Sequence, residues 1–299
     1  MWMFNSPKLR ISSLFLILLL HGCSKAPVPI KDFSEANQKF LKICKEEYHL
    51  NVITQKINKT LWIYVPVDDP LFDYKGTKDG PKKSNRGSEK NSLQYFDGRF
   101  DNGTFYFEYA VAKTMNYAVD YGYKSMYSEE YQKKQSRILS AIFQAYCDLT
   151  DTKTENSPEF FMLVISNIKK GIELTSLFNF EDFKQVQAGF LPPEEFVKRN
   201  VSDIQGRESI IGDFEGKHLD THDITWMEFL TKQALNRIRF KYQQSDFKPG
   251  DNTEEEMIAV ISEMFQAYHF QDFKSVELNN LATQKKVTFE QPQVATFAK

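Results

Sequence analysis

Two histidines and an aspartate alternate over a short polar stretch in the last third of the chain, as His218, Asp220 and His222. Side chains alternate between the two faces of an extended strand, so these three would project from one face. Imidazole and carboxylate groups are suitable zinc ligands, and the spacing is therefore a hypothesis for a metal site. In the alternative interpretation, both histidines are loop residues, and Asp220 and Asp223 favour the positive end of the helix that follows.

The known sequence motifs of catalytic sites do not identify a catalytic residue in this chain. The sequence contains no Gly-x-Ser-x-Gly elbow of a serine hydrolase and no glycine-rich loop for phosphate. Neither Cys44 nor Cys147 lies in an obviously electropositive context, which would favour a thiolate nucleophile. A pair of carboxylates would suit a glycosidase, but that chemistry depends on their separation in space. The sequence thus favours a protein that is not an enzyme, with a hydrolase as the alternative.

The first residues have the layout of a secretory signal peptide. Lys8 and Arg10 precede an apolar block of ten residues, Ile11 to Leu20, and no acidic residue lies before the block ends. A membrane-spanning helix needs roughly 20 apolar residues, so this block is too short to span a bilayer. We therefore expect residues 1–22 to direct export and to be removed.

The end of that block, Leu20-His21-Gly22-Cys23, resembles the lipobox of bacterial lipoproteins. The resemblance implies cleavage before Cys23, a diacylglycerol on its sulfur and acylation of its new amino group. Two or more acyl chains anchor a protein stably, so the expected partner is a membrane, with the body on its extracytoplasmic, periplasm-facing side. Ser24 resembles the sorting signal for the outer membrane. Residues 23–30 include Pro27 and Pro29 and would form a short tether.

The composition is that of a globular protein with a slight excess of acidic residues. The chain has 299 residues, 38 of them Lys or Arg and 40 of them Asp or Glu, and its hydrophobic fraction is 41%. A nucleic-acid-binding protein would be expected to carry clustered basic residues, so we expect no nucleic-acid partner. Cys44 and Cys147 can form one disulfide in an exported protein, but both fall on or beside apolar stripes of helices, where thiols behave as small hydrophobes.

Helical and strand periodicities alternate along the mature chain, and they predict an α+β fold. Three helices are each followed by an antiparallel hairpin, and the third of them starts at a predicted capping box, Thr253 with Glu256. A further helix starts at another predicted capping box, Thr225 with Glu228. The predicted hairpins are Val52–Ile57 with Leu61–Val65, Phe160–Ile165 with Ile172–Phe178, and Phe273–Leu278 with Lys286–Phe289.

An internal similarity suggests that a helix-strand-strand unit is repeated. Residues 138–146 and 260–268 share Ser, Phe, Gln, Ala and Tyr at matching positions, and both lead into a predicted hairpin. Repeated units usually stack to share a core, so we expect αββ units at 31–125, 126–215 and 216–299, packed as one body or as several. This comparison also predicts that Phe143 and Phe265 are both core residues.

Residues 68–92 are rich in glycine, lysine and serine, which predicts a flexible insertion in the first unit. It is either a solvated loop or a basic finger, Lys75 to Lys90, that contacts anionic headgroups or a partner. The aromatic run from Tyr95 to Tyr131 is either core or a stacking surface for cell-wall glycans.

The lipobox-like leader, the repeated units and the lack of catalytic motifs together favour a lipid-anchored envelope protein. It would bind an envelope protein or a glycan, as a scaffold or an assembly factor. The alternative is a periplasm-facing hydrolase that uses His218, Asp220 and His222 with a metal, or unidentified carboxylates.

Overall fold

The computed structural model describes residues 32–75, 82–83, 88–116, 119–120, 124–147, 149, 157–243 and 252–297. The predicted signal peptide, Cys23 and the tether lie outside these residues. The helices are α1 (Phe33–Lys42), η2 (Ile43–Glu47), α2 (Glu129–Tyr146), α3 (Phe180–Gln187), α4 (Pro193–Arg199), η3 (Glu208–Ile210), α5 (Trp226–Gln243), α6 (Thr253–Ala267) and α7 (Gln291–Thr296). The strands are β1 (Ile53–Ile57), β2 (Thr60–Val67), β3 (Phe72–Lys75), β4 (Lys82–Lys83), β5 (Ser88–Asp101), β6 (Thr104–Asn116), β7 (Val119–Asp120), β8 (Lys124–Tyr127), β9 (Phe160–Asn167), β10 (Ile172–Asn179), β11 (Val201–Gly206), β12 (Ser275–Asn280) and β13 (Lys285–Glu290).

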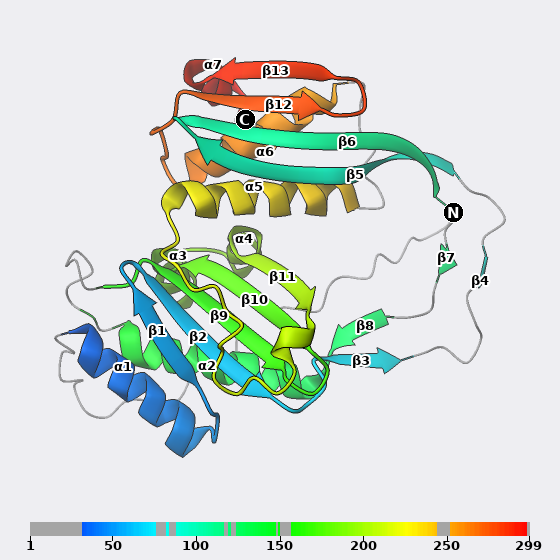
Figure 1. The fold of residues 1–299 in the computed structure, drawn as a ribbon. Helices are drawn as coiled ribbons and strands as arrows, with labels where there is room; N and C mark the ends of the chain where they lie inside the picture. The colour runs from blue at the N-terminus through cyan, green and yellow to red at the C-terminus, as the bar shows by residue number, and fades with distance from the viewer. Residues whose placement is uncertain are drawn as a thin grey trace, which may run out of the picture.

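A five-stranded sheet with the order β1-β2-β9-β10-β11 forms the lower half of the molecule in Figure 1. β2 and β9 are parallel, and the other neighbours are antiparallel. Both faces are covered, because successive residues of β2 point alternately into two different cores: Leu61 and Ile63 into one, Trp62 and Tyr64 into the other.

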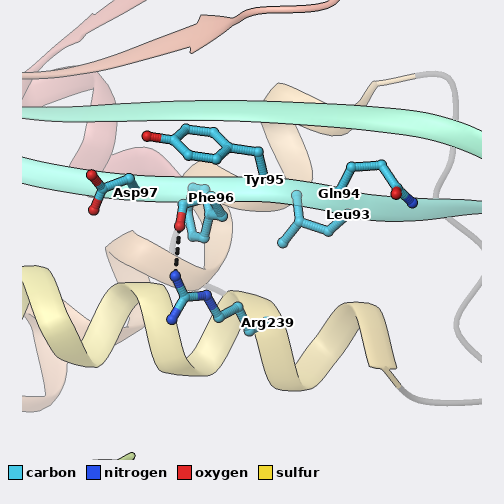
Figure 2. A pocket seen from close by; sticks show the side chains of 6 residues that line it. All are labelled: Leu93, Gln94, Tyr95, Phe96, Asp97 and Arg239. Carbon is cyan, nitrogen blue, oxygen red and sulfur yellow. Dashed lines mark hydrogen bonds between the residues drawn. The ribbon is translucent and has the colours of Figure 1, made fainter. Parts of the chain in front are cut away.

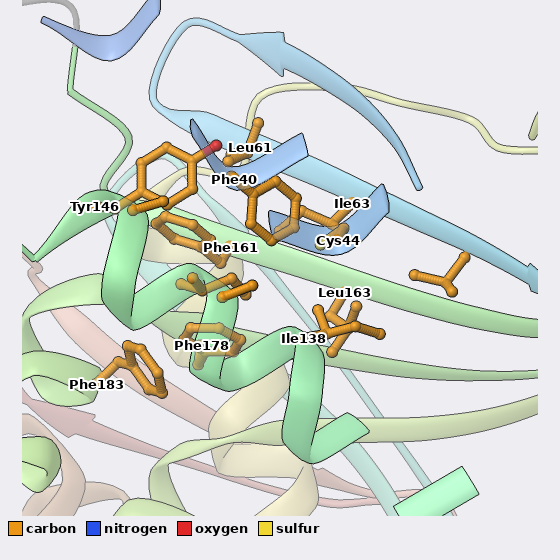
Figure 3. Close-up of a cluster of buried hydrophobic side chains, with 14 of the residues drawn as sticks. Phe40, Cys44, Leu61, Ile63, Ile138, Tyr146, Phe161, Leu163, Phe178 and Phe183 are labelled. Atoms are coloured by element: carbon orange, nitrogen blue, oxygen red, sulfur yellow. The ribbon is translucent and has the colours of Figure 1, made fainter. Parts of the chain in front are cut away.

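The first core lies between this sheet and four helices, α1 to α4, which we call the helical layer. Figure 3 shows Phe40 of α1, Tyr146 of α2 and Phe161 of β9 meeting in this core. The ring of Tyr146 lies 5.8 Å from that of Phe40 and 5.4 Å from that of Phe161. Aromatic rings bury large apolar areas, and so these contacts attach α1 and α2 firmly to the sheet.

A four-stranded sheet with the order β13-β12-β6-β5 forms the other half, and α5 lies between the two sheets (Figure 1). The second core joins the inner face of this sheet to α5, α6 and the upper face of the five-stranded sheet. Phe105, Phe107 and Tyr109 of β6 point into that core and are fully buried, because alternate residues of a strand share one face. β6 pairs in parallel with β12, which lies far from it in sequence.

The α+β class is confirmed, and each of the three predicted hairpins is present as an antiparallel pair, β1 with β2, β9 with β10, and β12 with β13. A helix precedes each pair in the chain: α1 with η2, α2 and α6. That these are copies of one duplicated unit stays a prediction. The two sheets are built across the predicted unit boundaries, because β5 and β6 from residues 31–125 share a sheet with β12 and β13 from residues 216–299.

Three local expectations were wrong. Thr253 is the first residue of α6 and not its cap, because the helix starts one residue earlier than the box requires, with Asn252 at the N-cap. Phe143 is 37% exposed, because it lies on the side of α2 that faces away from the sheet. The proposed insertion at 68–92 is partly strand, since 72–75 pair with β8 and 88–92 pair with β6; residues 76–81 and 84–87 lie outside the described residues.

No helix within the described ranges is long and apolar enough to cross a membrane.

Candidate functional site

A buried group of polar side chains lies on the upper face of the five-stranded sheet, where the segment between β11 and α5 crosses it. We call it the carboxylate-histidine cluster: Glu173 of β10, and Asp213 and His218 of the crossing segment. Their side chains are 4%, 9% and 2% exposed. Ser166 of β9 donates a hydrogen bond to the Oε2 atom of Glu173 over 3.3 Å. Charged groups at this depth must be paired, and here each one is.

A tight turn places His218. The carboxylate of Asp213 accepts hydrogen bonds from the backbone N–H groups of Glu215, Gly216 and His218 at 2.9–3.0 Å. Gly216 has a φ of +74°, and a Cβ atom there would lie 3.0 Å from the ring of Tyr64. Glycine fits this position because it adopts positive φ without steric cost and has no Cβ.

The imidazole of His218 lies between the two carboxylates. Its Nδ1 is 2.6 Å from Oδ2 of Asp213, and its Nε2 is 2.8 Å from Oε2 of Glu173. Each ring nitrogen therefore faces one carboxylate oxygen at hydrogen-bond distance. Both ring nitrogens are occupied, so His218 offers no lone pair to a substrate or a metal.

Neighbouring hydrogen bonds stabilise the ionised carboxylate of Asp213. Burial acts to raise the pKa of Asp213, but the backbone and ring hydrogen bonds from His218 outweigh it and hold the pKa well below its usual range. The hydroxyl of Tyr64 donates to the backbone oxygen of Asp213 over 2.5 Å, and its ring lies edge-on to that of His218 at 5.6 Å. Burial raises the pKa of Tyr64 to about 12. The cluster thus fastens the crossing segment to the sheet.

The structure does not bring His218, Asp220 and His222 together around one point. The side chain of His222 is 47% exposed, and its Nε2 lies 3.1 Å from Oε1 of Glu228 in α5. Its Nδ1 lies 3.0 Å from the backbone oxygen of Asp220. The described residues contain no group of three or more His, Cys, Asp or Glu side chains placed to hold a metal ion. As the alternative interpretation expects, both histidines lie in a loop.

Asp223, three residues before the start of α5, connects this loop to the β1–β2 hairpin. Its Oδ1 accepts hydrogen bonds from the backbone N–H of Lys59 at 2.9 Å and from the hydroxyl of Thr60 at 3.1 Å. Asp223 therefore holds the approach to α5 against the sheet.

Sequence reasoning did not find Asp213 and Glu173, the two residues that give His218 its role. Two signals were present. An Asp followed three residues later by Gly is typical of a side-chain-stabilised turn, and Glu173 is the one acidic residue in the apolar strand Ile172–Phe178. Neither signal indicates that the two residues meet, because 40 positions separate them and the contact arises from the way the segment crosses the sheet.

The two cysteines of the body are not joined by a disulfide. Cys44 is buried in the first core, and burial raises the pKa of its thiol to about 12. A protonated, buried thiol is a poor nucleophile, so Cys44 has a packing role. Cys147 follows the last residue of α2 and is partly buried.

A shallow hollow of about 360 Å³ lies on the surface where the edge strand β5 runs past α5 (Figure 2). It is lined by Leu93, Gln94, Tyr95, Phe96, Asp97 and Arg239. A β-bulge between Leu93 and Tyr95 interrupts the register with β6, and bulges are common where a strand redirects side chains for function. Nη2 of Arg239 donates to the backbone oxygen of Phe96 over 2.6 Å, which holds the guanidinium at the hollow.

The hollow combines an exposed aromatic ring with groups of both charges. Tyr95 is 43% exposed, whereas Phe96 beside it is buried in the second core. Asp97 can accept hydrogen bonds and Arg239 can donate them. The arrangement suits a polar partner that also has an apolar surface.

No protein-family model, curated protein or solved structure matches this chain.

Proposed function

We propose that this protein is a lipid-anchored component of the bacterial envelope whose folded body is a binding or assembly module without catalytic activity. The observation that carries the proposal is the segment Leu20-His21-Gly22-Cys23 at the end of a short apolar block. In this proposal Cys23 carries diacylglycerol and a further acyl chain, which together anchor a protein stably. The body faces away from the cytoplasm, and Ser24 favours the outer membrane.

The arrangement of the histidines supports a binding role over the hydrolase alternative. A metal-dependent hydrolase through His218 would require the ring to leave at least one of two buried carboxylates, and the carboxylate left behind would then be uncompensated. His222 is engaged separately at the surface by Glu228. The buried side chains of Glu173, Asp213 and His218 thus hold the segment between β11 and α5 in place.

The hollow beside β5 is the binding surface that we propose. Its exposed Tyr95 supplies an aromatic face, and Asp97 and Arg239 supply hydrogen-bonding groups. Such a surface suits an envelope protein or a cell-wall glycan. The slight acidic excess of the chain disfavours nucleic acid as the partner.

The anchor is tested by replacing Cys23 with alanine in the native host and labelling growing cells with a radioactive fatty acid. We expect the unchanged protein to take up label and to sediment with membranes, and Cys23→Ala to do neither. Labelling that persists in the variant would refute the proposal.

Binding is tested by placing a photo-crosslinking amino acid at position 95 in cells that make the lipidated protein. We expect a reproducible adduct with one envelope component, identified by mass spectrometry. The matched control places the same crosslinker at Ile204, which is 53% exposed on β11 and lies in the other sheet. Equal adducts from both positions, or none from position 95, would contradict a binding role for the hollow.

A further inference from the structure

The outer face of the four-stranded sheet is open in the described part of the chain. The helices α5, α6 and α7 all contribute side chains to the second core, so they pack on the inner face. Alternate residues of a strand share one face, so Tyr95, Asp97 and Arg99 of β5 point outward, opposite to the buried Phe96. All three are exposed. A sheet packed on one side commonly faces water on the other, and this face is therefore accessible to a partner.

Two carboxylates lie directly opposite one another on this face. The register pairs Asp97 of β5 with Glu108 of β6, and we call these two residues the acidic pair. Opposite side chains on neighbouring strands have Cβ atoms about 4.5–5.5 Å apart, and like charges at such positions destabilise a sheet. Asp97 accepts a hydrogen bond from the backbone N–H of Gly98 at 2.8 Å. Neither member of the pair forms an ion pair with a basic side chain among the described residues.

The basic side chains elsewhere on this face are engaged by other groups. Nζ of Lys286 in β13 lies 2.8 Å from Oε2 of Glu277 in β12. The guanidinium of Arg99 lies over the ring of Tyr106 at 4.9 Å, in the geometry of a cation–π contact. These contacts leave the negative charge of the acidic pair without a positive charge from the sheet itself. The uncompensated charge is therefore located at the end of the face that adjoins the hollow.

Tyr95 lies beside the acidic pair and presents an aromatic ring to solvent. Figure 2 shows its ring along β5, with the hydroxyl directed toward Asp97. Burial raises the pKa of Tyr95, and the negative charges of Asp97 and Glu108 raise it further, so the hydroxyl keeps its proton. The ring is 43% exposed. A neutral tyrosine ring next to two carboxylates is well placed to receive a cation, because the face of an aromatic ring attracts positive charge.

Resting on the binding role proposed above, we propose that the outer face binds a basic segment of a partner protein, with an arginine or lysine side chain between Asp97 and Glu108 and against the ring of Tyr95. Charge complementarity favours this partner, because a cation removes the repulsion within the acidic pair, whereas a neutral glycan leaves it in place. An arginine can donate to both carboxylates and stack on the ring at the same time. Tyr95 and Asp97 also line the hollow, so the two surfaces are continuous.

The test measures the binding of a fluorescent peptide to the purified, full-length protein in detergent. The probe is a short peptide in which arginine and serine alternate, and the comparison peptide has glutamine in place of each arginine. By fluorescence anisotropy we expect the arginine peptide to bind and the glutamine peptide not to bind. Asp97→Asn combined with Glu108→Gln should weaken the binding by about tenfold or more. High salt should weaken it as well, because the contact is electrostatic.

Glu194→Gln combined with Glu215→Gln is the matched control. It removes the same two negative charges, from exposed acids that lie outside the four-stranded sheet. We expect it to leave the binding of the arginine peptide unchanged. The melting temperature of Asp97→Asn combined with Glu108→Gln should be unchanged or higher, since the repulsion of the acidic pair is relieved. That result separates a loss of binding from a loss of the fold.

The outcomes distinguish this inference from the binding role on which it rests. Absence of binding by the arginine peptide, or equal weakening by both pairs of substitutions, overturns the basic partner. Tighter binding of a neutral oligomer of N-acetylglucosamine also overturns it, in favour of a glycan. In cells, the adduct from the crosslinker at position 95 should be lost in Asp97→Asn combined with Glu108→Gln. An adduct that persists overturns the basic partner and leaves the hollow as a binding surface, whereas no adduct from either protein refutes both.

Discussion

Phe265 and Phe143 occupy matching positions in the two similar helix segments, but their surroundings differ. The ring of Phe265 is 3% exposed and lies 5.0 Å from that of Phe105 and 4.6 Å from that of Phe273. Phe143 is 37% exposed, and its ring lies 6.4 Å from that of Phe183. The same residue type therefore has a core role in α6 and a surface role in α2.

This difference predicts unequal costs of truncation. We expect Phe265→Ala to lower the free energy of unfolding by about 3–5 kcal/mol, because it leaves a cavity among packed rings. Phe143→Ala should lower it by about 1 kcal/mol or less, as surface substitutions do. Chemical denaturation of both variants measures the two values. Equal costs would contradict the burial described here.

His222 gives a prediction about pH. Burial acts to lower its pKa, but the hydrogen bonds that the ring donates to the backbone oxygen of Asp220 and to the carboxylate of Glu228 outweigh it, so the pKa is raised above its usual value. A raised folded-state pKa stabilises the protein below the unfolded pKa, and this contribution is lost as the pH rises through the folded pKa. We expect Glu228→Gln to lower the pKa of His222 in an NMR titration. An unchanged or higher pKa would show that Glu228 does not stabilise the imidazolium.

At the scale of elements, the segment between β11 and α5 is held by contacts and not by regular structure. Its one regular element is the short helix η3. The carboxylate-histidine cluster fastens the segment to β9 and β10. The aromatic contact of Trp62 with His222 at 5.8 Å, and the hydrogen bond from Nε1 of Trp62 to the backbone oxygen of His222, hold its second half. The sheet therefore positions α5 through this segment.

We expect Glu173→Gln to destabilise the protein by about 1–3 kcal/mol, because it disturbs a buried hydrogen bond between the side chains of Glu173 and His218. Hydrogen exchange at the backbone amides of residues 213–218 should become faster, since their turn loses its attachment. The matched control is Glu215→Gln, whose side chain is 67% exposed and which should change neither value. Protection that stays unchanged in Glu173→Gln would show that the cluster does not fasten the segment.

At the scale of the whole molecule, a second polar network joins the helical layer to the α5–α6 side. Nη1 of Arg199 in α4 lies 2.7 Å from Oδ1 of Asp182 in α3, and the hydroxyl of Tyr268 donates to the other oxygen of Asp182 at 2.7 Å. The guanidinium also lies over the ring of Tyr268 at 5.1 Å. Gln233 of α5 donates to the hydroxyl of Tyr268 at 3.0 Å. The network therefore couples both cores.

We expect Asp182→Ala to lower the free energy of unfolding by about 1–3 kcal/mol, because Arg199 and the hydroxyl of Tyr268 lose a buried acceptor while Arg199 keeps Glu195 at 3.1 Å. Unfolding should remain a single transition, since the five-stranded sheet belongs to both cores. Coincident denaturation curves from tryptophan fluorescence and circular dichroism check this. Glu194→Ala, an exposed acid on α4, is the control. Two separate transitions in Asp182→Ala would show that the halves unfold independently.

The sequence alone predicts the elements whose signals are local. The three hairpins follow from strand periodicity within a few residues. The lipobox prediction also depends on a short contiguous segment. These features can be read from sequence because neighbouring residues determine them.

Tertiary structure decided which distant segments meet. The parallel pairing of β6 with β12, the contact of Glu173 with His218 and the exposure of Phe143 depend on chain topology and not on local pattern. The local pattern of a strand or a helix is compatible with many partner elements. Packing of the whole chain selects one of them.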